Sequence, residues 1–372
     1  MRSWSALPIP GGPFLAAGLV ALLTAFLEPA FPARDAVLAQ DETPELLTAV
    51  PETPALAFLD ATTARVLRPG AVRDFALALL SGTGESGTAK QGFALEATPW
   101  LFVPGLAIDG RRYRESRLAY VLANAQLSIG TARADGEDGD TDLALGLKLT
   151  LADHGDPLRS EEFRRALGES LLECAPARPD PTPSETCAGR ETAAAWEAWT
   201  AEHWNAARLA VAAAWGARLE ASELDERDYA GWRAWAVGAA PLGHRAQLIG
   251  QLAREERPAL GVEPAFDAWT AGARVLAGSP RVNGYLELLA ESREVEEVAV
   301  EGGAEPPEED DGTGIWSAGI EARVAEGLWA SAGFGSRFAA LHEADEKTFV
   351  AIGLRWGISS AARMDVLGGA AE

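Results

Sequence analysis

The most regular pattern in this sequence lies between Asp142 and Leu151, where every second residue is a leucine. The positions between the leucines hold small or polar residues, namely Ala144, Gly146, Lys148 and Thr150. Because successive side chains of a strand point to opposite faces, this segment has one apolar face and one small or polar face. In an exported protein the pattern predicts a transmembrane strand, apolar towards lipid and polar towards a lumen.

The same alternation recurs along the chain and predicts an all-β fold, a closed antiparallel transmembrane β-barrel of about 12 strands within 71–359. The expected strands are 75–80, 93–103, 121–129, 142–151, 208–219, 229–240, 245–254, 266–277, 281–292, 314–324, 328–340 and 347–359. Segment 75–80 fits the spacing of a helix as well as that of a strand. The even strand number of bacterial barrels favours the strand.

The rhythm changes between 154 and 206, where we expect a helical insert within the barrel. Segments 161–172 and 191–205 have the composition and spacing of helices. Cys174 and Cys187 lie between them and are the two cysteines of the chain. An exported chain meets an oxidising compartment, so we predict a disulfide that pins the insert, with two free thiols as the alternative. A metal site is not expected, because His203 is the only histidine nearby.

The connections between the later strands alternate in length, and this sets the orientation of the barrel. The short ones are 241–244, 278–280 and 325–327, and the longer, acidic ones are 220–228, 255–265, 293–313 and 341–346. Outer-membrane barrels have short periplasmic turns and longer outer loops. The acidic connections are therefore expected to face outward, and the same count puts the insert on the periplasmic side.

The N-terminal region reads as an export signal followed by a polar lead-in. An apolar run at 14–26 is too short to span a bilayer, and Val37-Leu38-Ala39 offers small residues for cleavage before Gln40. We predict a signal peptide at 1–39, with an anchoring N-terminus as the alternative. Residues 40–70 are expected to be a lead-in or a plug, since 55–67 is apolar enough to dock in the barrel or on its periplasmic side. Residues 360–372 form a C-terminal tail.

Composition and charge exclude several classes of function. The chain has 372 residues and a formal net charge of -23, which argues against a nucleic-acid partner because phosphate binding needs clustered lysine and arginine. Its four histidines, His154, His203, His244 and His342, lie in no recognisable catalytic motif. We therefore expect neither enzyme activity nor a cofactor.

Charged residues on the predicted inward faces are the candidate functional residues. These lumen-lining positions are Glu96, Lys148, Arg208, Arg218, Arg274, Glu287, Glu321, Arg323, Arg337 and Arg355. Confined charges need partners, so one interpretation is an arginine and glutamate network that packs the lumen shut. The other is a narrow pore whose arginines favour anionic solutes, because cationic side chains focus potential on a constriction.

Segment 143–151, the acidic glycine turn at 135–140, and the final strand 347–359 with its Trp356 resemble bacterial outer-membrane β-barrel proteins of the porin-like kind. The resemblance covers most of 93–359 and differs at the end, where 360–372 follows the last strand. It implies an outer-membrane location, contact with lipid and lipopolysaccharide, and recognition by the barrel-assembly machinery. The expected role is a passive channel for small solutes, with anions favoured by the arginines. The alternative is a non-conducting structural or surface-interaction barrel with a filled lumen.

Overall fold

The computed structural model describes residues 53–60, 62–69, 75–83, 89–99, 108, 110–133, 140–173, 184–219, 227–260, 265–295, 313–325, 327–339 and 347–358. All of them belong to the unit Glu42–Glu372. The predicted signal peptide at 1–39, the tail at 360–372, Cys174 and His342 lie outside the described residues.

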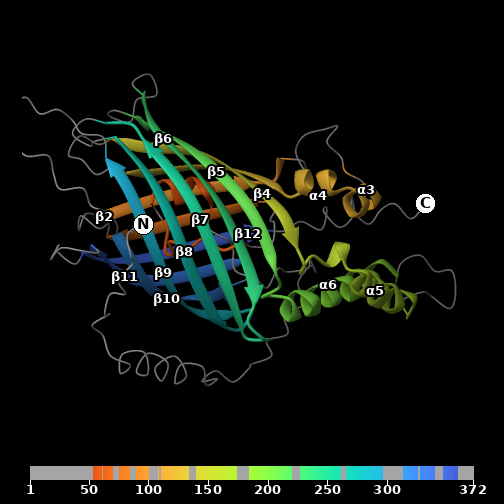
Figure 1. The fold of residues 1–372 in the computed structure, drawn as a ribbon. Helices are drawn as coiled ribbons and strands as arrows, with labels where there is room; N and C mark the ends of the chain where they lie inside the picture. Colours follow the sequence, from red (N-terminus) through yellow and green to blue (C-terminus); the bar gives the residue numbers. More distant parts are fainter. Residues whose placement is uncertain are drawn as a thin grey trace, which may run out of the picture. The chain divides into compact units, whose positions relative to one another are not determined.

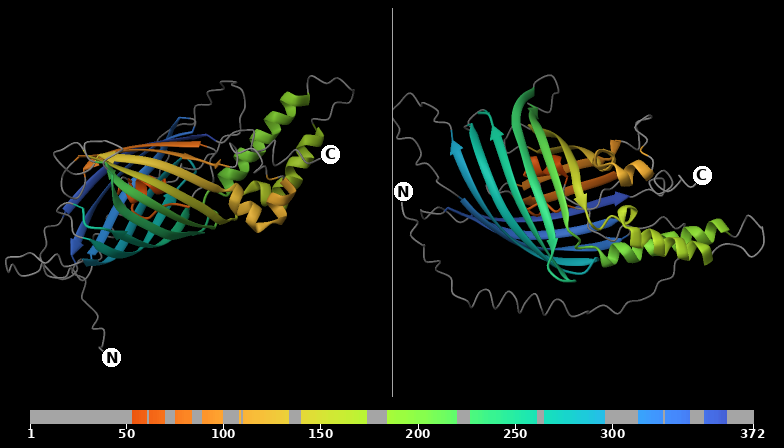
Figure 2. Two further views of the ribbon diagram at one scale, coloured as in Figure 1. Left: turned by 90° about the horizontal axis from the view of Figure 1, so that it is seen from above. Right: turned by 45° about the vertical axis from the view of Figure 1, so that its right-hand side comes forward.

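Twelve antiparallel strands close into a barrel in which each strand pairs with its neighbours in sequence (Figures 1 and 2). Their bounds are β1 Phe75–Thr83, β2 Ala89–Ala97, β3 Ala125–Arg133, β4 Thr141–Asp153, β5 Arg208–Leu219, β6 Arg227–Pro241, β7 Ala246–Arg257, β8 Phe266–Gly278, β9 Val282–Val295, β10 Thr313–Ala325, β11 Leu328–Ala339 and β12 Lys347–Ile358. The ring closes where β1 pairs with β12, with Phe75 opposite Ile358. The predicted fold class is confirmed.

The apolar face of each strand points out of the barrel. Leu145 is 53% exposed and Ile352 is 58% exposed, while Ala144 and Lys148 on the opposite face of β4 are buried. Closure leaves no open sheet edge, so backbone groups are paired all around the ring. None of the described helices has the length and apolar content needed to cross a membrane.

Two predicted strands are partly wrong. Residues 121–123 belong to helix α4 (Arg117–Ala123), which follows α3 (Gly110–Glu115), and the strand starts at Ala125. The Ser116 hydroxyl caps α4 by accepting a hydrogen bond from the Ala119 N–H. Tyr113 packs edge-on against Tyr120 at 5.4 Å between ring centroids. These two local features favour a helix where alternation alone suggested a strand. The second case is the strand predicted at 93–103, because β2 ends at Ala97.

The insert between β4 and β5 contains the short helix η2 (Pro157–Arg159), α5 (Glu161–Glu173) and α6 (Ser184–Glu202). Phe163 of α5 packs edge-on against Trp196 and Trp199 of α6. The indole of Trp204 donates to the backbone oxygen of His244 at 3.3 Å, which ties the insert to the short connection between β6 and β7. The insert thus lies at the end of the barrel that carries the short connections.

The cysteine pair remains a prediction. Cys187 lies half-buried in α6, and its expected partner Cys174 falls in the part of the chain that is not described.

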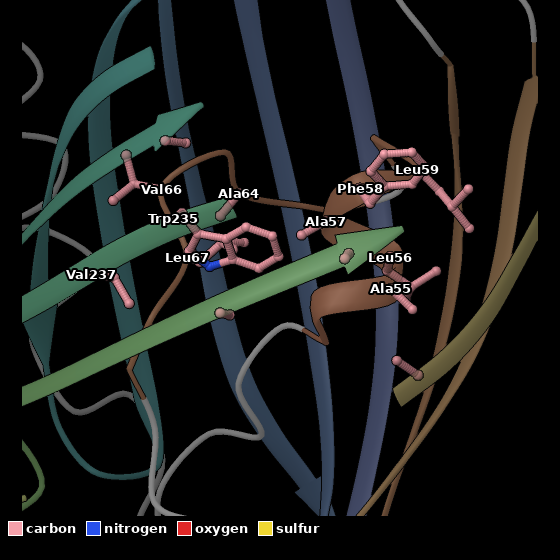
Figure 3. Close-up of a cluster of buried hydrophobic side chains, with 14 of the residues drawn as sticks. Ala55, Leu56, Ala57, Phe58, Leu59, Ala64, Val66, Leu67, Trp235 and Val237 are labelled. Atoms are coloured by element: carbon pink, nitrogen blue, oxygen red, sulfur yellow. The ribbon is translucent and has the colours of Figure 1, made fainter. Parts of the chain in front are cut away.

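A segment that precedes the first strand lies inside the barrel (Figure 3). We call residues 53–60 and 62–69 the plug. It consists of helix α2 (Pro54–Phe58), a turn at Leu59 and Asp60, and an irregular stretch from Thr62 to Pro69. Its apolar side chains are buried and pack with Trp235, Val237, Ile249 and Leu276 of the barrel wall.

Candidate functional site in the barrel lumen

Glycine residues on the inner faces of the strands make room for the plug. A side chain at Gly216 would overlap the ring of Phe58, and one at Gly272 would meet Val66. In the same way, a side chain at Gly146 would meet Pro54. The close approach of the plug therefore depends on the missing Cβ at these positions.

Buried polar side chains of the wall bind the backbone of the plug. The Glu287 carboxylate accepts hydrogen bonds from the N–H groups of Arg65 at 2.7 Å and Val66 at 3.0 Å. Gln251 accepts from the N–H of Leu67 at 2.8 Å, and the Ser128 hydroxyl accepts from that of Ala55 at 3.1 Å. A backbone taken out of water must find such partners. The wall thus provides a specific seat for the irregular stretch of the plug.

Wall side chains also donate to carbonyl oxygens of the plug. The Tyr285 hydroxyl donates to the oxygen of Thr63 at 2.5 Å, and Arg274 donates to that of Val66 at 3.2 Å. Arg233 reaches the oxygen of Ala57 at the end of α2 at 3.1 Å. Hydrogen bonds from the barrel wall therefore hold both α2 and the irregular stretch of the plug.

One carboxylate inside the barrel gathers three guanidinium groups near the end with the short connections, because Arg274, Glu321 and Arg355 lie close to the ends of β8, β10 and β12 there. Glu321 lies 2.9 Å from Arg274, 2.9 Å from Arg355 and 3.6 Å from Arg68. Glu321 and Arg274 are fully buried, and Arg68 belongs to the plug. We call these four residues the Glu321 cluster. A buried charge is tolerated only with close opposite charges, so the cluster joins the plug to β8, β10 and β12.

Other inward charges form separate pairs along the wall. Lys148 lies 3.3 Å from Glu96, which also accepts a hydrogen bond from Gln126 at 2.7 Å. Near the insert, Arg208 pairs with Asp153 at 2.9 Å. These pairs cross between neighbouring or nearby strands and neutralise charge inside the barrel.

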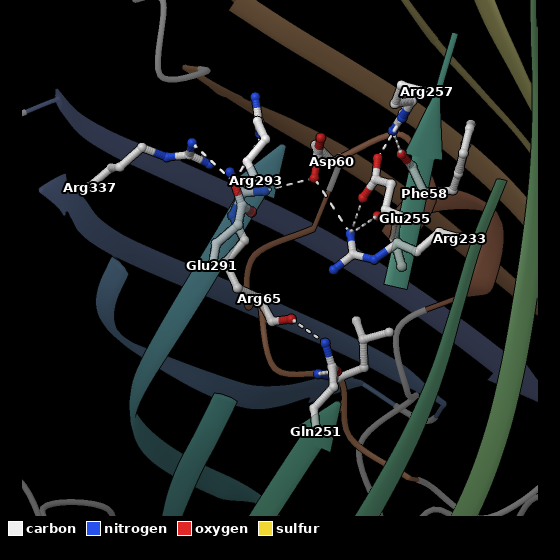
Figure 4. A network of polar contacts seen from close by, with 12 residues as sticks. Phe58, Asp60, Arg65, Arg233, Gln251, Glu255, Arg257, Glu291, Arg293 and Arg337 are labelled. Carbon is white, nitrogen blue, oxygen red and sulfur yellow. Dashed lines mark hydrogen bonds and ion pairs between the residues drawn. The ribbon is translucent and has the colours of Figure 1, made fainter. Parts of the chain in front are cut away.

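A second network surrounds the turn of the plug at the end with the longer connections (Figure 4). Asp60 pairs with Arg65 at 2.9 Å and with Arg233 at 3.8 Å. Asp60 has φ 53°, a left-handed conformation that aspartate tolerates better than most residues. Glu255 pairs with Arg233 at 3.6 Å and also binds Arg257. The turn is thus held by alternating charges from the plug, β6 and β7.

A cavity of about 320 Å³ lies at this end, with the turn of the plug as part of its lining; we call it the mouth cavity. Glu291 lines it and pairs with Arg293 at 2.9 Å and Arg337 at 3.6 Å. Arg218, paired with Asp142 at 2.9 Å, also lines it. Leu289, Ile315 and Phe266 supply apolar walls, so the cavity offers both charged and apolar surface.

The structure places the ten predicted lumen residues on inner faces of the strands. Seven are buried, namely Glu96, Lys148, Arg208, Arg274, Glu287, Glu321 and Arg355, while Arg218, Arg323 and Arg337 are half-buried. Arg274, Glu321 and Arg355 come together in one cluster, and Glu96 pairs with Lys148. The others lie at different heights of the barrel and form no single ring. Their role as lining of an open pore stays a prediction.

Several residues of the site were missed at the level of sequence. Gln251 lies on the inner face of β7, where the outward Leu248 and Leu252 already give the register that would have identified it. Arg233 is harder to find, because β6 has tryptophans on both faces, with Trp235 buried and Trp232 half-buried. Asp60, Arg65 and Arg68 of the plug carry no periodic signal at all.

No protein-family model and no curated protein matches the chain. Solved structures that resemble it include a KdgM porin, with 7% identity, 76% of this chain and 99% of that chain covered, and a TM-score of 0.36. LpxR from Salmonella typhimurium has 9% identity, covers 76% and 100% of the two chains, and gives a TM-score of 0.35. The outer membrane protein Omp33 of Acinetobacter baumannii has 9% identity, coverage of 78% and 100%, and a TM-score of 0.32.

Proposed function

We propose that this chain is an outer-membrane β-barrel whose lumen is closed at rest by its own plug, and that small solutes pass only when the plug leaves its seat. The observation that carries the proposal is the set of buried wall side chains, Glu287, Gln251, Ser128 and Tyr285, that bind plug backbone. Such contacts are specific for an irregular chain segment in the lumen. They support a closed resting state more than a freely open passage.

The lining of the lumen supports passage once the plug is absent. Its inner faces carry alanine, glycine and paired charges, such as Ala144, Gly216 and the pair of Lys148 with Glu96. The inner face also carries large apolar side chains such as Trp235, Ile249 and Leu276, which pack against the plug. Where the wall side chains are small or charged, removal of the plug leaves space that water can fill. The arginines of the wall favour anionic solutes.

A permanently closed structural barrel is the second candidate. It is favoured by the Glu321 cluster, because a plug that moves away takes Arg68 with it and breaks this buried cluster. Arg274 and Arg355 would then remain as the partners of the Glu321 carboxylate. In this case the acidic outer connections would meet partners, and nothing would cross.

Conductance in planar bilayers tests these proposals. The wild-type protein is expected to give no steady current, only brief openings, and the variant lacking 53–69 a steady current biased towards anions. Heat-modifiable migration in detergent gels provides the control that both proteins are folded. A steady wild-type current equal to that of the deletion variant, or silence from a folded deletion variant, contradicts the plug. A wild type that never opens supports the structural barrel.

We further propose that the chain is exported through the signal peptide at 1–39 and assembled into the outer membrane, in contact with lipid and lipopolysaccharide. The outward leucines and isoleucines of the strands support this location, because a soluble protein rarely exposes such a continuous apolar belt. Recovery of the mature protein from the outer-membrane fraction, starting at Gln40, is the expected result. Recovery from the soluble periplasmic fraction contradicts the proposal.

A further inference from the structure

We propose that the mouth cavity binds a small organic anion that carries two or more carboxylate or phosphate groups. Seven arginines and four carboxylates line this cavity of about 320 Å³, a formal excess of three positive charges in a chain whose net charge is -23. A concave site that concentrates one sign of charge attracts the opposite sign. The volume is near the lower end of small-molecule sites, so the ligand is metabolite-sized and not a polymer.

The four carboxylates of the cavity are already engaged by its arginines. Asp60, Asp142 and Glu291 each have an arginine at 2.9 Å, and Glu255 has Arg233 at 3.6 Å. Arg233 and Arg257 also donate to the backbone oxygens of Ala57 and Phe58, but the Nε groups of Arg233 and Arg293 are buried and have no hydrogen-bond partner among the described residues. The cavity therefore has hydrogen bonds to give to an anion and little unpaired negative charge to hold a cation.

Arginine geometry and apolar surface define the ligand further. Guanidinium groups recognise carboxylate and phosphate oxygens in a bidentate manner. The Arg293 guanidinium lies 4.1 Å from the centre of the Phe266 ring, and Leu289 and Ile315 lie close by in the lining. A ligand with acidic groups on a short carbon skeleton fits both kinds of surface better than an inorganic ion does.

The site rests on the proposed function in one respect, because the plug supplies Leu59, Asp60 and Arg65 to its lining. A ligand in the mouth cavity lies against the turn of the plug. It also lies beside Arg233, which reaches both Asp60 and the oxygen of Ala57. The cavity is therefore complete only while the plug is seated.

Calorimetric titration of the detergent-solubilised wild-type protein with citrate tests the inference. We expect saturable binding that weakens as sodium chloride is added, and no binding of glucose or putrescine. In Arg293→Gln, loss of one charge-assisted contact is expected to weaken citrate binding by about tenfold or more. The control is Arg254→Gln, which removes the same charge at a similar height on the outward face of β7, where Arg254 pairs with Asp267. Its affinity is expected to stay within about twofold of wild type.

If Arg293→Gln does not fold, as judged by heat-modifiable migration, Arg337→Gln takes its place. Absence of citrate binding, equal affinities of the inner and outer variants, or binding of putrescine in place of citrate overturns the inference. Binding of putrescine would mean that the acidic connections, and not the arginines, determine the sign of the net charge at the site. Binding does not require conduction, so a silent channel that does not bind citrate overturns the inference alone. A steadily conducting wild type that binds citrate overturns the resting plug and the plug's part in the site, and leaves the wall arginines as the binding groups.

Discussion

Glu321 holds together a buried cluster of arginines inside the barrel. It is the carboxylate shared by Arg274, Arg355 and Arg68, and it is fully buried. Removing one partner from a buried charged group costs far more than the same change at the surface, because the remaining charges keep their desolvation penalty. The pair of Arg111 with Glu115 on α3 is the matching exposed case, at 3.0 Å with both side chains largely in solvent.

The first prediction compares these two sites. Glu321→Gln is expected to lower the free energy of unfolding by about 3 kcal/mol or more, whereas Glu115→Gln is expected to change it by less than about 1 kcal/mol. Urea unfolding in detergent micelles, followed by tryptophan fluorescence, measures both. Equal effects of the two substitutions would show that Glu321 does not hold the lumen together.

At the scale of elements, the plug packs closely against the barrel wall because the wall has small residues where the two meet. The ring of Phe58 in α2 occupies the space where a side chain of Gly216 would stand. Gly250 on β7 provides the contrast, because it faces outward and a Cβ there meets no other atom within 4 Å. The same substitution at these two glycines thus distinguishes an effect on the packing of α2 from an effect on the strand itself.

The second prediction uses this pair. Gly216→Leu is expected to displace α2, since overlap in a packed interior costs about 1–3 kcal/mol, which corresponds to roughly fivefold to 150-fold in the open population. Trypsin cleavage after Arg65, identified by mass, is expected to accelerate by that factor, and brief openings in bilayers to become more frequent. Gly250→Leu is expected to behave as wild type. Slow cleavage in both variants would mean that the space at Gly216 does not determine where α2 sits.

Sequence alone predicts the strands well and the contents of the lumen poorly. Alternation places Leu143 to Leu151 on one face because lipid outside and small or charged side chains inside impose a period of two. The plug has no such period. Its partners Glu287, Gln251 and Glu321 lie 184 residues or more away in the chain, so no local pattern points to them. Helix α4 was missed for a local reason, the Ser116 cap and the pair of Tyr113 with Tyr120.

At the scale of the whole molecule, the belt of outward side chains defines the environment of the barrel. Leu145 on β4 is 53% exposed, and Leu118 on α4, outside the strands, is 69% exposed. In water these two leucines would be equivalent surface positions. In a bilayer only Leu145 faces hydrocarbon, where a charged side chain is costly.

The third prediction follows from that difference. Leu145→Arg is expected to reduce the stability of the protein in lipid vesicles by about 2–4 kcal/mol, whereas Leu118→Arg is expected to change it by no more than about 0.5 kcal/mol. Urea titration of vesicle-inserted protein, read by heat-modifiable migration, measures both. Similar small effects at the two positions would indicate that the belt does not face lipid.

The plug precedes β1 by a short stretch of chain, and this attachment decides how it can move. Only residues 70–74 separate Pro69 from Phe75, and five extended residues reach at most about 18 Å. The end of a displaced plug at Pro69 therefore stays close to β1, so the effective concentration of the plug near its seat remains of about millimolar order whatever the number of barrels in the membrane. The closure that we propose is then a reversible intramolecular event, which each molecule repeats independently of its neighbours.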